Sequence, residues 1–535
     1  MKTQESRTQT MSLDMNLGGE GVTRRGFMGG MAAMAAGAAA AAAGVSTAFA
    51  DEAEDAEAAE AEEAEATEEE AVEAEAETEE ATEEAAEEET STTSTYLTLE
   101  SPTGWTGTPE DLLALGVSTM PLEDLNQYRE AYVAAQTDYT CEDGTVIPAC
   151  YVKVRALINT YNFGCGSVSD TAFDDIMENF SEDDCQAFID MPLGVEFTAY
   201  EMAAEEDRDV DECTEICERL ADAGYIRAFD SNRGRCYNQV PYAIGIAEYH
   251  LPEDIESDNT HVGLEGADAG TFMAQNGTPI MYYVPVDESV IEGSDILPFD
   301  DLKEKVKSKN VACIMPCYCR YKALAGTYGH ENIPSLEDFV TGEYADYFSD
   351  ICDQRVETCI YTGNEAQYFI DQGMARQITG EQAAEYIQRS VDDGFMIEST
   401  FDKTSECICS CHVDSCMFLA MWLSLGDADT IVSYPAFQQV SHYTLEVETD
   451  KCIACGTCVD RCPMHIITIN DEGWAEAGEP CFRCGQCAYV CPQGARHLVQ
   501  RDESELAPLD ETNLDHANQA ASYRFETGLL TIPEA

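Results

Sequence analysis

Two runs of cysteines near the end of the chain constrain its fold more than any other feature. The first run consists of Cys452, Cys455, Cys458 and Cys462, and Pro463 follows it. The second run repeats the same spacing with Cys481, Cys484, Cys487 and Cys491, followed by Pro492. Three thiolates at this spacing can close a tight loop around a metal cluster, whereas the fourth points away from that loop. A chain with this pattern must fold so that the two loops meet.

This spacing is typical of bacterial two-cluster ferredoxins, in which the fourth cysteine of each run ligates the other cluster. We therefore predict that one 4Fe–4S cluster is held by Cys452, Cys455, Cys458 and Cys491. The second 4Fe–4S cluster is predicted to be held by Cys481, Cys484, Cys487 and Cys462. A zinc ribbon would offer two Cys-x-x-Cys pairs instead, so the pattern favours iron–sulfur clusters over zinc.

Residues 1–50 are interpreted as a Tat signal peptide. Arg24 and Arg25 precede an apolar run of small residues from Gly29 to Val45, and Ala48-Phe49-Ala50 ends the segment. These parts stand in the order of a twin-arginine signal. We expect export by the Tat translocase to the periplasm or the extracytoplasmic cell surface. Membrane contact is then expected only through the signal or a partner.

The charge of the chain is strongly negative, and much of it lies in a low-complexity tract over residues 51–95 that contains no Lys or Arg. Self-repulsion favours a disordered acidic linker there. The formal net charge of the whole chain is −76. This charge excludes nucleic acid as a partner, because phosphate binding needs clustered Lys and Arg.

The region between the linker and the cysteine runs is predicted to be α+β. Residues 96–180 read as an N-terminal helical region, and residues 181–250 read as three helices and a hairpin that resemble a winged helix. The helix expected over 211–223 is acidic, so we interpret this winged-helix-like segment as a packing or docking module. The tail over 501–535 is expected to pack back on the body or onto a partner.

Residues 280–445 are predicted to form a mixed α/β, cysteine-rich middle domain. A buried strand over 311–315 is expected before Cys317, and cysteines alternate from Cys407 to Cys411. Such alternation places thiols on one side of an extended segment, a usual way to bind a metal. We predict a candidate third site, either iron–sulfur or zinc, with disulfides or buried free thiols as alternatives. Its candidate ligands are Cys317, Cys319, Cys352, Cys359, Cys407, Cys409, Cys411 and Cys416.

From about residue 198 to residue 505 the order of motifs resembles a family of dicluster 4Fe–4S ferredoxin-type proteins of anaerobic bacteria. The resemblance is carried by Cys317-Tyr318-Cys319-Arg320, Glu357-Thr358-Cys359, Tyr368-Phe369-Ile370 and the C-terminal ferredoxin domain over 446–500. It implies electron transfer and little about substrate. The chain departs from the pattern between Cys407 and Cys416, where the family tends to have adjacent cysteines.

These features together predict an exported iron–sulfur electron-transfer protein. It would be a carrier or the electron-transfer subunit of an anaerobic respiratory oxidoreductase, so its own status as an enzyme stays open. The alternative is a reductase with an active site in 280–445 that is fed by the two clusters. A redox-sensing or scaffolding role built on the winged helix is a third hypothesis, which the export signal and the acidic helix disfavour.

The expected partners are redox proteins, either a membrane-bound or an exported oxidoreductase. Residues 451–500 hold four basic and five acidic residues and are nearly neutral, in contrast to the rest of the chain. We therefore predict that a redox partner docks there and that Arg483 and Arg496 contribute to docking. His465 and His497, which also lie in this region, are interpreted as surface residues and not as ligands.

Overall fold

The computed structural model describes residues 108–161, 173–252, 274–286, 299–349 and 354–533. The predicted Tat signal, the acidic linker and Cys352 lie outside these residues. All the described residues belong to one compact unit. None of the helices in these ranges has the length and apolar character needed to span a membrane.

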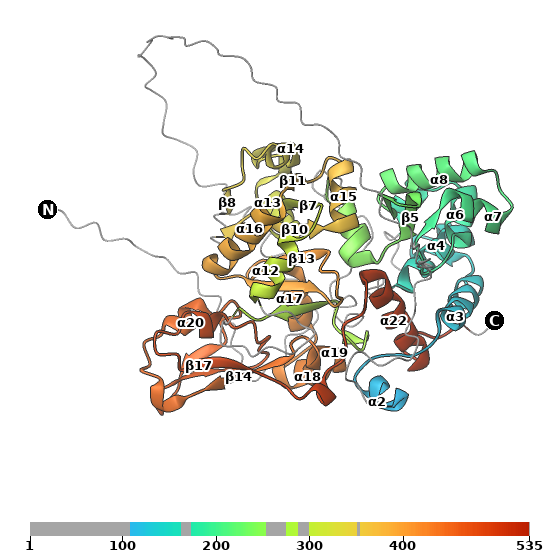
Figure 1. Cartoon of the computed structure of the whole chain (residues 1–535). Coiled ribbons are helices and arrows are strands. Elements are labelled where there is room, and N and C mark those ends of the chain that lie inside the picture. Colours follow the sequence, from blue (N-terminus) through green and yellow to red (C-terminus); the bar gives the residue numbers. More distant parts are fainter. Residues whose placement is uncertain (1–107, 162–172, 253–273, 287–298, 350–353, 534–535) are drawn as a thin grey trace, which may run out of the picture. The chain divides into compact units, whose positions relative to one another are not determined.

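A six-stranded sheet forms the centre of the middle region (Figure 1). Every neighbouring pair in it is antiparallel. Its strand order is β11 (Arg376–Ile378), β7 (Ala312–Pro316), β10 (Glu357–Thr362), β13 (Cys407–Cys411), β12 (Met396–Thr400) and β6 (Met281–Val284). The described chain therefore mixes helices and strands, as the sequence predicts.

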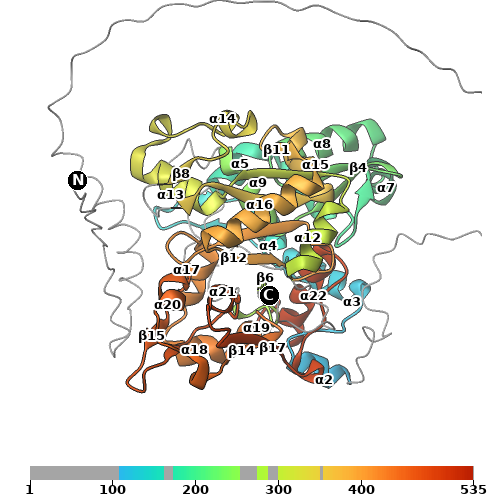
Figure 2. The ribbon, with the colours of Figure 1, turned by 60° about the vertical axis from the view of Figure 1, so that its left-hand side comes forward.

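One face of this sheet is covered by helices α12 (Phe299–Lys307) and α16 (Gly380–Asp393), which pack side by side (Figure 2). Strand side chains alternate between the two faces of a sheet. The side chains that meet α12 and α16 in one buried cluster are the isoleucines Ile314, Ile360, Ile397 and Ile408. Because these isoleucines are buried on this face, their neighbours along each strand must point to the opposite face of the sheet.

The opposite face of the sheet carries most of the sulfur-containing side chains. Cys359, Met396, Cys407 and Cys411 belong to a second buried cluster on this face. Helices α13 (Tyr318–Tyr328), α15 (Gly363–Asp371) and α17 (Met417–Ser424) contribute apolar residues to the same cluster. The cysteines and the isoleucines of the strands are thus separated onto opposite faces.

The ends of α16 are set by residues that adjoin them in the sequence. The Thr379 N–H donates to the side chain of Gln382 at 2.9 Å, and the Gln382 N–H donates to the Thr379 hydroxyl at 3.2 Å. This reciprocal capping box satisfies two amides that would otherwise lack partners. Gly394 ends the helix in the left-handed conformation, with φ of 105°, which glycine adopts without a steric penalty.

The described N-terminal part is mainly helical and precedes a small three-stranded sheet. The helices are α2 (Pro109–Ala114), α3 (Leu122–Ala134), α4 (Ala149–Asn159), α5 (Asp174–Asn179), α6 (Glu182–Asp190), α7 (Ala199–Glu206) and α8 (Val210–Asp222). The sheet order is β3 (Phe197–Thr198), β5 (Gly234–Gln239) and β4 (Ile226–Ser231). Three helices and a hairpin therefore stand in 181–250 as expected, while their likeness to a winged helix stays a prediction.

The C-terminal part holds two short antiparallel pairs and two short helices. Strand β14 (Tyr443–Val447) pairs with β17 (Arg496–Gln500), and β15 (Ile467–Ile469) pairs with β16 (Ala475–Ala477). Each cysteine run continues into a helix after a left-handed glycine, α20 (Thr457–Arg461) after Gly456 and α21 (Gln486–Tyr489) after Gly485. The two helices contact each other, so the runs meet as a two-cluster domain requires.

The tail packs back on the body, which resolves the alternative that the sequence leaves open. Helix α22 (Asn513–Glu526) is almost wholly buried and contacts α3. Arg129 of α3 donates to the Asn518 side chain at 2.9 Å. The remaining short elements are β1 (Tyr139–Thr140), β2 (Val146–Ile147), α9 (Ala247–Tyr249), α14 (Leu336–Val340), β8 (Phe348–Ser349), β9 (Gln354–Arg355), α18 (Ala428–Ser433) and α19 (Pro435–Gln438).

Candidate metal centres

The strands of the middle sheet place a set of thiols on one face. Cys407, Cys409 and Cys411 alternate along β13, and the Ile408 between them points to the other face. Cys359 lies on the neighbouring strand β10, where Ile360 is paired with Ile408. This register brings Cys359 beside Cys409. The alternation predicted from the sequence therefore has the expected result.

Two helix starts supply further thiols above this face. Cys317 is the N-cap residue of α13, Cys319 lies in the first turn of α13, and Cys416 is the N-cap residue of α17. The Met417 N–H donates to the Cys319 sulfur at 3.4 Å. Helix N-termini carry unpaired N–H groups and a partial positive charge, so they favour anionic thiolates or an anionic cluster.

Six of these thiols form a closed ring, which we call the thiol ring. Each member influences the pKa of the next, in the order Cys317, Cys359, Cys409, Cys411, Cys416, Cys319 and back to Cys317. Cys407 joins from outside the ring, with its sulfur 3.6 Å from that of Cys409. The structure thus brings together seven of the eight candidate ligands, and the eighth, Cys352, lies outside the described residues.

The pKa values of the six thiols are alternately lowered and raised around the ring. Hydrogen bonds from Cys319 and Cys359 hold the pKa of Cys317 well below its usual value. The pKa of Cys409 is lowered by hydrogen bonds from Cys359, Cys407 and Cys411, and that of Cys416 by Cys319 and Cys411. The intervening thiols, which donate these hydrogen bonds, have raised pKa values: Cys319, Cys359 and Cys411.

Arg320 provides a buried positive charge next to the ring. Its guanidinium donates to the Thr358 hydroxyl at 2.8 Å and to the Ser410 carbonyl at 2.5 Å, and it lies 4.5 Å from the centre of the Phe395 ring. Its charge adds to the lowering of the pKa of Cys317 and of Cys409. Arg320 therefore favours the thiolate form that binds metals.

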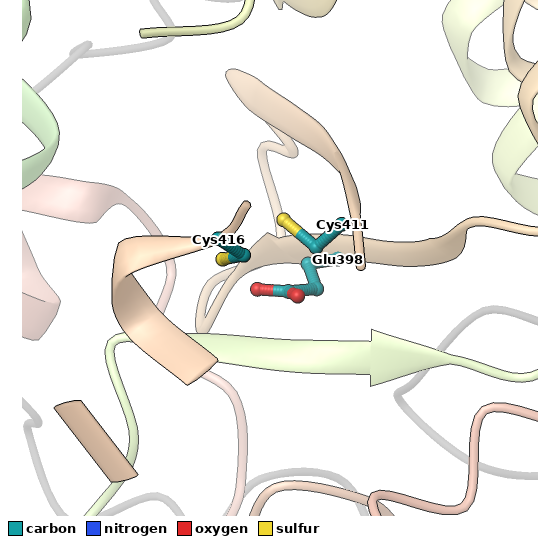
Figure 3. Close-up of side chains that lie close together, drawn as sticks. All are labelled: Glu398, Cys411 and Cys416. Carbon is teal, nitrogen blue, oxygen red and sulfur yellow. The ribbon is translucent and has the colours of Figure 1, made fainter. Parts of the chain in front are cut away.

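A buried carboxyl group also faces the thiols. Glu398 lies on β12 directly opposite Cys409, and its side chain lies close to those of Cys411 and Cys416 (Figure 3). The ligand atoms of these three residues lie within 4.8 Å of one another. Burial, followed by the charges of Cys416 and Cys409, raises the pKa of Glu398 well above its usual value. Glu398 thus adds an oxygen ligand to a set that is otherwise sulfur.

These donors fit an iron–sulfur cluster or a zinc ion. Thiolates are soft ligands that select zinc and iron–sulfur clusters among biological metals. Four of the six ring cysteines are buried, whereas Cys319 and Cys409 are partly exposed. The six come from four separate chain segments, and helix N-termini and Arg320 offset their negative charge. A 4Fe–4S cluster and a zinc ion each need about four ligands. The six thiols of the ring are therefore more than either metal requires. The donor set alone does not choose between the two metals.

The ferredoxin loops bring their cysteines together in the crossed arrangement expected from the sequence. Cys462 of the first run lines one cavity with Cys481, Cys484 and Cys487 of the second. Cys452 and Cys491 both raise the pKa of Cys458, after the larger effect of its burial. Seven of the eight cysteines are therefore grouped as the two predicted sets require, while the place of Cys455 in the first set and ligation itself stay predictions.

The predicted docking role of Arg496 is wrong. Arg496 is only 3% exposed, and its guanidinium donates to the Cys487 sulfur at 3.7 Å and to the Ala475 carbonyl. Its charge opposes the effect of burial, which raises the pKa of Cys487 to about 12. Arg496 therefore serves the second ligand set and offers little to a partner. Arg483 is partly exposed and donates to Cys481 O in its own loop at 2.8 Å.

Sequence reasoning missed Glu398 and the inward role of Arg496. An isolated acidic residue within the apolar strand Met396-Ile397-Glu398 is a signal that could have pointed to the thiol face. Arg496 has no comparable signal, because its burial depends on the pairing of β14 with β17. Both residues become visible only once the strands are in register.

Comparison with known proteins agrees with the C-terminal geometry. Residues 451–495 match a 4Fe–4S dicluster domain. A probable ferredoxin of Methanosarcina thermophila is 47% identical over 34 residues, which are 6% of this chain and 59% of that protein. An uncharacterized ferredoxin of Methanocaldococcus jannaschii is 36% identical over 53 residues, which are 10% of this chain and 86% of that protein. No solved structure matches the chain.

Proposed function

The chain belongs to the family of 4Fe–4S dicluster ferredoxins through residues 451–495, and from this we propose that it is an exported electron-transfer protein with a third iron–sulfur cluster in the thiol ring. Thiolate-bound clusters supply one-electron transfer when they are bound. Cys452, Cys455, Cys458 and Cys491 would hold the first cluster, and Cys481, Cys484, Cys487 and Cys462 the second. Four members of the thiol ring would hold the third.

Met396 is the observation that carries this proposal. It is fully buried on β12 and lies directly opposite Cys411 of the ring. Its side chain also lines the cavity formed with Cys462 and the cysteines of the second run. Met396 thus neighbours both the ring and the second ligand set. A zinc ion in the ring could not exchange electrons with the second ligand set, because zinc has no redox chemistry. We therefore propose an iron–sulfur cluster for the ring.

The first ligand set is the one that faces solvent. Cys455 is exposed, and the neighbouring Ile453 is 61% exposed. We propose that a redox partner approaches this surface, and that the electron path leads inward to the second ligand set and on past Met396 to the ring. The chain would then be a carrier or the electron-transfer subunit of an anaerobic respiratory oxidoreductase, exported by the Tat translocase through residues 1–50.

The test is an iron and acid-labile sulfide count with EPR on anaerobically prepared full-length protein. Three 4Fe–4S clusters require about twelve irons per chain, whereas two require about eight. The Cys409→Ser variant should lose about four irons, because Cys409 contacts three other thiols. The matched control is Cys313→Ser, which alters a fully buried thiol of β7 outside the ring. This variant should keep all the irons of the wild type.

A count of about eight irons in the wild type, with zinc or disulfides at the ring, would reject the third cluster. Equal iron loss in Cys409→Ser and Cys313→Ser would attribute the loss to misfolding of the sheet and not to ligation. The ferredoxin signals should persist in both variants, which shows that the C-terminal domain is intact.

Glu398 favours a second candidate, a reductase whose active site is the ring. A carboxylate is a poorer ligand than a thiolate for iron–sulfur clusters, so an iron bound by Glu398 could exchange it for a substrate. The test adds cyanide to the reduced protein and compares the EPR signal of the ring before and after. A changed signal that is lost in Glu398→Gln supports the reductase, and an unchanged signal supports the carrier.

A further inference from the structure

A second group of ligating side chains lies between the ring and the ferredoxin domain. The loop after β13 carries His412 and Asp414, and the loop after Cys462 carries His465. The Val413 N–H donates to the Pro463 carbonyl at 3.1 Å, so the two loops already meet through their backbones. One loop lies between Cys411 and Cys416 of the ring, and the other follows a ligand of the second set.

The three side chains converge on one point. Nδ1 of His412 lies 3.3 Å from one carboxylate oxygen of Asp414, and Nε2 of His465 lies 3.3 Å from the other. The ligand atoms of all three lie within 4.8 Å, and the imidazole centres are 5.2 Å apart. Ligands about 2.0–2.1 Å from a tetrahedral zinc ion are separated from each other by roughly 3.3–3.4 Å. Both nitrogen–oxygen separations are of this size, but they end on different oxygens of Asp414, so the carboxylate would bind the ion through one oxygen or bridge to it with both.

The same contacts are poorer as simple ion pairs. Charge-assisted hydrogen bonds between His and carboxylate are usually about 2.7–2.9 Å long. The Asp414 N–H donates to His412 Nδ1 at 3.3 Å, so Nδ1 is the unprotonated nitrogen, and an ion bound there would replace this long hydrogen bond. His465 is also held at φ of 55°, an uncommon conformation for a residue other than glycine.

We propose that His412, Asp414 and His465 bind one divalent transition-metal ion of the zinc class. Two imidazoles and one carboxylate are borderline ligands that suit Zn²⁺ better than the thiol-selective iron–sulfur clusters. Asp414 and His465 side chains are 41% and 54% exposed, so water can complete the coordination. The ion would tie the loop between Cys411 and Cys416 to the loop after Cys462, and so fix the spacing of the two thiol sets.

The site does not depend on a cluster in the ring, since none of its three ligands is a thiol. The test equilibrates the anaerobically prepared full-length protein with Zn²⁺ after treatment with EDTA. Bound zinc is then counted by mass spectrometry, and its ligands are read from the zinc X-ray absorption spectrum. We expect about one zinc per chain with nitrogen and oxygen ligands and no sulfur.

Two variants and one control assign the zinc to these side chains. His465→Ala and Asp414→Asn should each weaken zinc binding by at least about tenfold and leave the iron content unchanged. The control is His497→Ala, because His497 lies 3.5 Å from Glu446 in the same domain but has no second histidine partner. Zinc binding that survives in His465→Ala, sulfur ligands in the spectrum, or no bound zinc at micromolar concentration would each overturn the proposal. Cys409→Ser should keep the zinc, which separates this proposal from the third cluster.

Discussion

Glu248 of α9 is a buried carboxyl group whose protonation should control stability at neutral pH. The Gly245 N–H donates to it at 2.8 Å, and it has little contact with water. Burial, opposed by this hydrogen bond and reinforced by Cys409 and Glu365, raises the pKa of Glu248 from 4.5 to about 8. Glu248 is therefore protonated in the folded protein at pH 7 and ionised in the unfolded chain.

The raised pKa predicts that stability falls as pH increases. The contribution of Glu248 is fully present below its unfolded pKa of 4.5 and is lost as the pH rises through about 8. Glu248→Gln, which mimics the protonated form, should remove this loss, at most on the order of 5 kcal/mol. Thermal unfolding at about pH 5 and about pH 9 should show a gain in the variant only at the higher pH. Glu381→Gln on the exposed face of α16 is the control, and a gain there too would contradict the explanation.

At the scale of elements, the C-terminus of α16 joins the middle sheet to the ferredoxin loops. Arg461 of α20 donates to the Asp392 carbonyl at 2.8 Å, and Gln486 of α21 donates to the carbonyls of Val391 and Phe395 at 3.1 and 2.6 Å. The last carbonyls of a helix lack partners within the helix, and cations near them are favoured by its dipole. Arg461 and Gln486 thus supply the partners that the helix itself cannot.

Arg461→Met should lower the free energy of unfolding by about 1–3 kcal/mol, because the carbonyls of Asp392 and Val391 at the end of α16 would lose a charged donor. Urea unfolding of protein with matched iron content measures this loss. Arg483→Met is the control, since Arg483 donates to Cys481 within its own loop. Equal losses in the two variants would mean that the contact with α16 adds nothing beyond the general effect of removing an arginine.

Local signals explain which elements were predictable from the sequence. Thr379, Gln382 and Gly394 specify α16 through contacts within a few residues, so its ends follow from the chain alone. The alternation of Cys407, Cys409 and Cys411 likewise predicts a shared face. Membership of the ring was only partly predictable, because it requires the register of β10 against β13 and the placement of two helix starts above them. Glu398 was missed for the same reason.

At the scale of the whole molecule, the thiol sets differ in their exposure to solvent. Cys455 is exposed, whereas the ring thiols Cys317, Cys359, Cys411 and Cys416 are buried. Met396 lines the cavity of the second ligand set and pairs with Cys411 of the ring. The docking role expected for Arg496 was wrong because net charge does not show which arginines are buried in the folded protein. What remains exposed near the first set is partly apolar, as at Ile453.

This arrangement predicts that electrons reach the ring past Met396. Met396→Ala should slow reduction of the ring after the ferredoxin domain has been reduced, because a void replaces packed atoms and tunnelling weakens steeply across empty space. The substitution should also cost about 2–5 kcal/mol of stability. Met202→Ala is the matched control, since Met202 is equally buried but lies in α7, within the segment 181–250. Rapid-freeze EPR after mixing with a reductant follows the two signals separately.

If both variants reduced the ring at the wild-type rate, the electron path could not run through β12. If both slowed it equally, the effect would come from lost stability, and only selective slowing in Met396→Ala places the methionine between the two centres.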